Sequence, residues 1–336
     1  MIAGGCRYGT FCVTVLSVCT ACVMLIFHSP SWAVEGATAA GPIGGSDIRS
    51  AIVPPAGLYG GVVGLGYSFG ELTNGTGNPA PGLNSVNVRN DIAALFLLYV
   101  PDLKVFGGQI GLFATEAAGY ECGQLTSVIP QRCVTGFGDP YLEASWSRFF
   151  GQVRPATVSG AFPILQGVNV RVGIGAVLPI GSYNQQTQSQ NGVTVGNNTR
   201  DVAPSVAVTY TTPPLIGDGT EVSARLYWNN YGTNSLTDYH ASPLLDLDFA
   251  ISEHIGRFQL GLAGTYLFQT GRDTQYGAVV PPDGRRFEYL DLGGVLNYDM
   301  AEYNASIRLK VVTTVISQNA PVAPLIVIIS FAKKLY

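Results

Sequence analysis

The sequence has few charged residues. Of its 336 residues, 12% are charged, whereas a typical soluble domain has about 25%. The net charge of −4 does not suggest the clustered basic surface that binds nucleic acid. So weakly charged a chain is unlike an ordinary cytosolic enzyme, and we predict neither enzymatic activity nor a nucleic-acid partner.

Metal ligands are also scarce. Beyond residue 33 the only histidines are His240 and His254, and they form no cluster with cysteines. Four of the six cysteines fall in the first 33 residues, which leaves Cys122 and Cys133, close together in the sequence. Two such cysteines in an exported loop most simply form a disulfide. We therefore predict a disulfide, no metal site and no cofactor.

Long apolar runs are missing after Val34, so no transmembrane helix is expected there. The N-terminus differs, because FCVTVLSVCTACVMLIF follows the basic residue Arg7 and precedes SWA at residues 31–33. This order of a basic residue, an apolar run and a small-x-small site predicts a signal peptide over residues 1–33. The alternative is an N-terminal membrane anchor.

What recurs after Val34 is alternation of apolar and polar residues, the pattern of strands with two different faces. In YNASIRLKV, residues 303–311, Tyr, Ala, Ile, Leu and Val alternate with Asn, Ser, Arg and Lys. Each segment is about as long as a membrane-spanning strand of roughly 9–11 residues with some overhang. About twelve such segments cover residues 57–70, 86–100, 104–117, 137–150, 168–180, 201–212, 220–231, 241–252, 256–270, 285–298, 302–315 and 323–336.

The connections between these segments alternate in length. PDLK, EHIG and DMAE read as tight turns. One connection, residues 151–167, is long where a short turn is expected. Short turns at one end and long loops at the other are typical of outer-membrane barrels. The long polar connections are residues 71–85, 118–136, 181–200, 232–240 and 271–284.

A soluble sandwich would also alternate, but its water-facing side is usually rich in Lys and Glu. Here the polar faces are mostly Ser, Thr, Asn, Gln and Gly, and aromatic residues recur near strand ends, as they do at bilayer interfaces. In lipid a sheet satisfies every backbone group only if it is closed. We therefore predict an all-β fold, a closed antiparallel transmembrane β-barrel of about twelve strands over residues 56–336. It would lie in the bacterial outer membrane in contact with lipid, preceded by a periplasmic segment over residues 34–55.

Three stretches resemble a known family: GFGDPYLEASWSRFF (136–150), VRVGIGAVLPIGSYN (170–184) and LGLAGTYLFQTGRDTQYG (260–277). They are similar to proteins of the meta-pathway of phenol degradation, which are outer-membrane transporters of aromatic or hydrophobic compounds. The resemblance implies a barrel that takes up such solutes passively. Read from the residues alone, GFGDP is a turn that feeds a strand. The motif residues in the first two stretches are Gly136, Gly138, Asp139, Pro140, Leu178, Pro179, Gly181 and Tyr183.

Strand parity directs a set of charged residues toward the lumen. The set contains both signs, so we predict salt-bridge networks that brace the interior, since unpaired buried charges are costly. Its members are Glu143, Arg171, Glu221, Arg225, Asp246, Asp248, Asp291, Arg308 and Lys310.

Two enzymatic alternatives deserve comparison with this interpretation. Asp246 and Asp248 share a strand face about 6–7 Å apart, near the spacing of an inverting glycosidase pair. Their small, polar neighbours do not form the apolar pocket that raises the pKa of a catalytic acid.

His240 and Ser242 resemble the His-x-Ser pair of barrel-type outer-membrane lipases, but parity turns them away from lipid. A third alternative is a structural or adhesive barrel that acts through its long loops. The sequence predicts neither the oligomeric state nor the solute.

Overall fold

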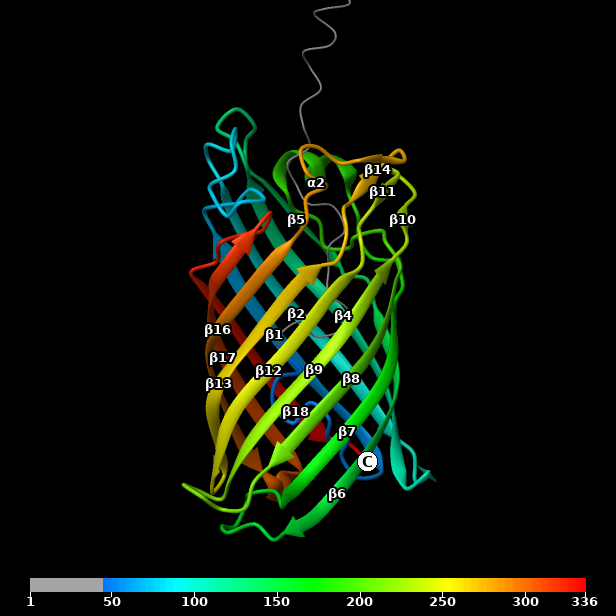
Figure 1. Cartoon of the computed structure of the whole chain (residues 1–336), viewed down its shortest axis with the longest axis vertical. Helices are drawn as coiled ribbons and strands as arrows, with labels where there is room; N and C mark the ends of the chain where they lie inside the picture. The colour runs from blue at the N-terminus through cyan, green and yellow to red at the C-terminus, as the bar shows by residue number, and fades with distance from the viewer. Residues whose placement is uncertain (1–44) are drawn as a thin grey trace, which may run out of the picture. The chain divides into compact units, whose positions relative to one another are not determined.

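The computed structural model describes residues 45–336. Its long strands form one closed antiparallel sheet, because each pairs with its neighbours in sequence and the first pairs with the last (Figure 1). The predicted fold class and the number of long strands are confirmed. The twelve strands of the wall are β1 (Gly57–Phe69), β2 (Asn87–Val100), β4 (Gly108–Gln124), β6 (Tyr141–Arg154), β7 (Ile164–Val177), β8 (Asp201–Thr211), β9 (Gly219–Tyr231), β12 (Leu244–Ile255), β13 (Phe258–Gln269), β16 (Glu288–Met300), β17 (Ala305–Gln318) and β18 (Leu325–Lys334).

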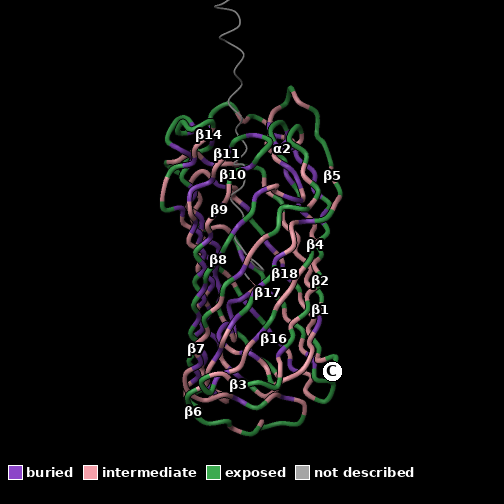
Figure 2. Tube along the Cα trace, turned by 90° about the vertical axis from the view of Figure 1, so that its right-hand side faces the viewer, coloured by how far each residue is buried: buried purple, intermediate pink, exposed green. Residues whose placement is uncertain are grey.

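Burial alternates along these strands, as period two requires. In β8 every second residue is buried, while Val202, Val206 and Val208 between them are exposed. Figure 2 shows the same alternation along other strands. Soluble monomers rarely expose large apolar patches, so a belt of this kind is typical of a wall that faces lipid. Further exposed members of the belt are Leu95, Leu97, Leu142, Ile174, Val222, Ile251, Leu260, Leu262, Ile307, Leu309 and Ile329.

The two ends of the barrel differ. One, which we call the loop end, carries β5 (Arg132–Phe137), α2 (Gln185–Asn191) and a small sheet (Figure 1). That sheet consists of β10 (Thr233–Asn234), β11 (Tyr239–His240), β14 (Thr274–Gln275) and β15 (Ala278–Val279). The opposite, turn end has only short elements, β3 (Lys104–Val105) and the 3-10 turn η1 (Ala301–Tyr303). No helix within residues 45–336 has the length and apolar character needed to cross a membrane.

Two predicted boundaries were wrong because strands continue past their alternating part. The expected long turn over residues 151–167 is shorter, since β6 runs to Arg154 and β7 begins at Ile164. Gly167 has a φ of 132°, and a Cβ on it would lie 2.3 Å from the Phe150 carbonyl oxygen. A glycine is therefore required at this close approach of the two strands, and it interrupts the apolar pattern.

The expected loop over residues 118–136 is mostly a hairpin in which β4 pairs with β5. Cys122 and Cys133 are direct partners in this pairing, and their sulfur atoms form a disulfide. The close spacing of these two cysteines thus reflects two strands that rise from the wall at the loop end.

Candidate functional site

Residues 45–53, which we call the lumen segment, lie inside the barrel. The Ser46 hydroxyl donates to Asp248 of β12 at 2.6 Å, and the Ser50 and Ser223 hydroxyls are 2.7 Å apart. The backbone carbonyl of Ala51 accepts a 2.6 Å hydrogen bond from Ser147 of β6. Since these contacts reach strands on different parts of the wall, the segment crosses the interior rather than following one strand.

Ion pairs fix the same segment. Arg308 donates to Asp47 at 2.7 Å, and the Lys310 ammonium lies 3.3 Å from the other carboxylate oxygen of Asp47. Arg49 forms an ion pair of 3.1 Å with Asp299. Asp47 is completely buried, so its two cationic partners offset the cost of removing its charge from water.

The lumen segment overlaps the region predicted to be periplasmic, residues 34–55. Residues 34–44, and the predicted signal peptide over residues 1–33, lie outside the described residues. Residues 46–51 are held in the interior by the contacts above. Their sequence, SDIRSA, has no strand-like alternation, and its only hint is a pair of opposite charges shortly before the first strand.

A second network brings together three of the predicted lumen residues. Arg171 of β7 and Arg225 of β9 each donate to Glu143 of β6 at 2.7 Å. The Tyr141 hydroxyl donates to the same carboxylate at 2.7 Å. Glu143 and Arg225 are buried, with side chains 2% and 5% exposed. One carboxylate therefore holds two guanidinium groups inside the wall and ties three strands together.

Asp246 and Asp248 face the interior together but differ in their partners. Asp248 accepts hydrogen bonds from the hydroxyls of Ser46 and Thr265, at 2.6 and 2.7 Å. Neither carboxylate oxygen of Asp246 has a hydrogen-bond partner among the described residues, although Asp246 is only 1% exposed. Of the two, Asp248 holds the lumen segment, and neither forms an ion pair with an inward Arg or Lys among the described residues.

The two remaining acids of the predicted set also face the interior. Glu221 accepts the Arg49 amide hydrogen at 2.7 Å and lies 3.3 Å from His254. Asp291 of β16 accepts the Thr265 amide hydrogen at 2.9 Å. The structure thus divides the nine predicted residues into three groups. Three form the Glu143 network, four contact the lumen segment, and Asp246 and Asp291 form no ion pair among the described residues.

Toward the loop end the interior contains a cavity of about 380 Å³, which we call the inner cavity. Its wall is mostly apolar and includes four aromatic rings, those of Tyr67, Phe69, Phe287 and Tyr289. Leu267, Ile326 and Ile328 add aliphatic surface. A volume of this size and an apolar lining with a few polar groups are usual for small-molecule sites. The polar members are Asn90, Glu121, Gln188, Thr194, Asn197, Asp291 and Asn319.

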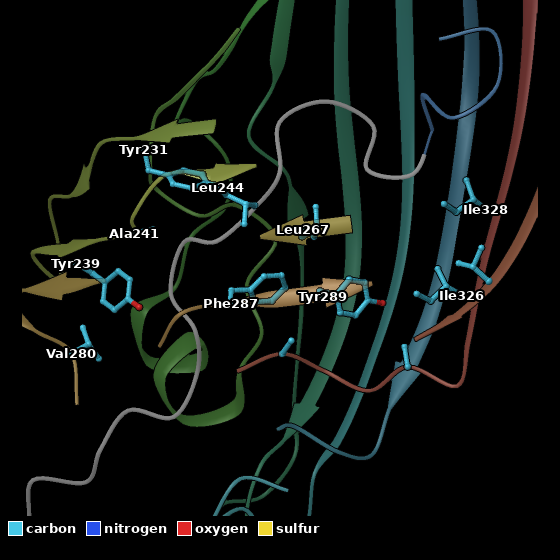
Figure 3. Packing of buried hydrophobic residues seen from close by; sticks show 13 residues of the cluster. Tyr231, Tyr239, Ala241, Leu244, Leu267, Val280, Phe287, Tyr289, Ile326 and Ile328 are labelled. Carbon is cyan, nitrogen blue, oxygen red and sulfur yellow. The ribbon is translucent and has the colours of Figure 1, made fainter. Parts of the chain in front are cut away.

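The apolar character of this part of the interior was not predicted from the sequence. Figure 3 shows Leu267, Phe287, Tyr289 and Ile326 gathered with other buried apolar residues. Parity assigns these residues to the inner face correctly, but it carries no information about height along the barrel. The interior is therefore charged beside the lumen segment and aromatic nearer the loop end.

Several family-motif residues hold two chain segments together at the loop end of the wall. The carboxylate of Asp139 accepts the amide hydrogens of Gly181 and Asn197, at 2.8 and 2.7 Å. A Cβ on Gly181 would lie 2.4 Å from the Gly138 carbonyl oxygen, so the backbones pack closely. Leu178 donates its amide hydrogen to Pro140 at 3.0 Å. The two motif stretches thus meet each other. Gly136 lies in β5, Pro179 is exposed, and Tyr183 is half-buried just before α2.

His240 and Ser242, the pair considered as a lipase-type alternative, lie beneath the loops. Ser242 is 4% exposed, and its amide hydrogen is donated to Asp273 at 2.8 Å. The hydroxyl of Tyr239 donates to the same carboxylate at 2.6 Å, and Gln269 donates at 2.8 Å. Burial raises the pKa of Asp273 above its ordinary value. His240 pairs with Thr233 and Thr274 in the small sheet. The pair therefore belongs to a network that anchors loops, and Ser242 is not open to lipid.

Comparison with protein families gives a match over residues 69–322 to the family described as "Putative MetA-pathway of phenol degradation". The chain belongs to this family. The three stretches that carry the resemblance in sequence fall inside the matched region.

One solved structure shares the fold of this family member. The crystal structure of an outer membrane channel from Pseudomonas putida F1 aligns with a TM-score of 0.68 at 14% identity, over 85% of this chain and 98% of that chain. The transport unit of the autotransporter AIDA-I from Escherichia coli gives a TM-score of 0.48 at 10% identity, over 86% and 93% of the two chains. A comparison with curated proteins found no match.

Proposed function

We propose that the protein is an outer-membrane channel for the passive uptake of small hydrophobic or aromatic compounds. The observation that carries the proposal is the inner cavity, in which four aromatic rings and several aliphatic side chains surround about 380 Å³. A water-filled pore for polar solutes would have polar walls. An apolar space inside a barrel favours solutes that are themselves apolar, because they lose little hydration on entry.

The exterior supports a membrane location. The wall exposes a belt of Leu, Ile and Val side chains, and only lipid covers such a surface at low cost. The similar channel from Pseudomonas putida F1 comes from an outer membrane, and the family is named for phenol degradation. An exported chain with a signal peptide over residues 1–33 would reach that membrane.

The lumen segment lies in the path of a solute through the barrel. Its contacts reach β6, β8, β9, β12 and β17, so a solute that leaves the inner cavity toward the turn end meets it. The segment would have to move for that route to open. Only ion pairs and hydrogen bonds within this chain hold the segment. When the segment moves, water can take the place of its partners, so opening requires no cofactor.

A matched pair of substitutions on β18 tests the proposal. Ile328 lines the inner cavity, whereas its neighbour Ile329 is 49% exposed on the outer face. Ile328→Trp should fill part of the cavity and lower the uptake of phenol at low concentration to nearly the rate of a deletion strain. Ile329→Trp should leave uptake unchanged, since a Trp on the lipid-facing side is well tolerated.

The measurement is the initial uptake rate of labelled phenol in a deletion strain that carries each variant. Heat-modifiable migration on gels should be the same for both variants, which shows that both barrels fold. Uptake that does not depend on the protein, over a broad panel of aromatic compounds, would contradict the proposal. That result would favour a barrel that acts through its loops.

A further inference from the structure

The charged residues that line the inner cavity all have one sign. Glu121 of β4 and Asp291 of β16 are 8% and 6% exposed, and both belong to the lining. No Lys or Arg belongs to it among the described residues. A ligand in this cavity would therefore meet two carboxylates and no side-chain cation.

Two inward cations of the wall, Lys310 and Arg225, are held by other groups. The ammonium of Lys310 lies 3.3 Å from Asp47 and 3.3 Å from the Thr265 hydroxyl. The guanidinium of Arg225 donates to Glu143 and Ser205. Asp291 accepts a hydrogen bond from a neutral donor, the Thr265 amide. These contacts leave Lys310 and Arg225 bound outside the cavity lining.

A third carboxylate, that of Asp246, lies next to a lining residue but outside the lining itself. Asp246 lies directly opposite Leu267 in the pairing of β12 with β13, and Leu267 lines the cavity. Asp246 is 1% exposed, and neither of its carboxylate oxygens has a hydrogen-bond partner among the described residues. Because Asp246 is not part of the lining, the carboxylates that a solute meets directly are Glu121 and Asp291.

We propose that the inner cavity selects neutral or cationic ring compounds with a hydroxyl or amino donor, and excludes aromatic carboxylates. The proposal rests on the uptake function proposed above and adds a charge preference to it. The aromatic rings contact the ring of the solute. The carboxylates accept its donor and repel an anionic group, because like charges brought together without screening are strongly unfavourable. Specificity here comes as much from rejection as from attraction.

Binding of three ring compounds of similar size tests this preference. Benzyl alcohol, benzylammonium and benzoate differ mainly in the charge and donor of one substituent. Each would be titrated at about pH 8, a pH chosen because burial raises the pKa of a carboxyl above its ordinary value. The protein would be full-length in lipid nanodiscs, with empty nanodiscs as the blank. We expect benzoate to bind at least about tenfold more weakly than the other two, a difference that corresponds to roughly 1.4 kcal/mol.

Substitution of the two lining carboxylates tests whether they cause the charge preference. Glu121→Gln combined with Asp291→Asn removes both charges with little change of shape, so benzoate affinity should rise about tenfold and benzylammonium affinity should fall. Glu116→Gln is the matched control, because Glu116 lies on the same strand as Glu121 but is exposed. It should leave all three affinities unchanged.

Binding to the wild-type protein alone separates the charge preference from the uptake proposal. If the wild-type protein binds benzoate as tightly as benzyl alcohol, the charge preference is wrong while the uptake proposal stands. If none of the three compounds binds above the blank, the proposed function itself fails. If the double variant keeps the wild-type order of affinities although it folds, the selecting carboxylates are not Glu121 and Asp291.

Discussion

Deleting residues 46–53 should turn the barrel into an open pore. Its single-channel conductance in planar bilayers is expected to rise about tenfold, because a twelve-stranded ring is wider than the eight-stranded barrels that side chains alone can fill. The lumen segment supplies backbone and side-chain groups that contact Asp248, Ser223 and Ser147. Without it, these polar side chains would be hydrated, and water would occupy the space.

A milder change should act in the same direction. Asp47→Asn combined with Arg49→Gln removes the charges that pair with Arg308, Lys310 and Asp299 but keeps the segment in the chain. This double variant should open often and briefly, whereas the variant that lacks residues 46–53 should stay open. The control is Arg89→Gln, which breaks a 2.7 Å ion pair with Asp91 that is exposed to solvent. If the deletion conducts no better than the wild-type protein, the lumen segment does not close the pore.

The wall of the barrel could be predicted because alternation reports directly on the faces of a strand. Ile307 and Leu309 are exposed, while Arg308 and Lys310, which alternate with them, point inward, as the sequence indicates. One physical requirement, apolar toward lipid and mixed toward the lumen, acts on every strand. The same alternation therefore recurs in each of the twelve strands of the wall.

The partners inside the barrel could not be predicted in the same way. Parity places Arg308 in the lumen, but its partner Asp47 lies 261 positions away in a segment without regular structure. Nor does parity distinguish Asp291, which borders the aromatic cavity, from Arg308, which holds the lumen segment. Those differences depend on how far along the barrel axis each residue lies and on how the strands close into a barrel. Both are properties of the whole sheet.

The largest single-residue effect on stability is expected at Glu143. Glu143→Gln leaves the guanidinium groups of Arg171 and Arg225, which both bond to it at 2.7 Å, without their common anion. Removing one partner from a buried ion network typically costs about 3–5 kcal/mol. The free energy of unfolding, measured by urea titration in lipid vesicles with gel mobility as the readout, should fall by this amount. Glu302→Gln breaks a 2.8 Å pair with Arg257 whose groups are exposed, and its stability should stay close to wild type.

A triple variant separates loss of pairing from loss of shape. Replacing Glu143 by Leu, and Arg171 and Arg225 by Met, removes every charge of the network while keeping roughly the same buried volume. Buried ion networks replaced by apolar residues are often as stable as the original, so this variant should recover most of the stability that Glu143→Gln loses. If Glu143→Gln is as stable as Glu302→Gln, water must already reach the two guanidinium groups. If instead the triple variant is the least stable, the network determines the packing of β6, β7 and β9 as well as the balance of charge.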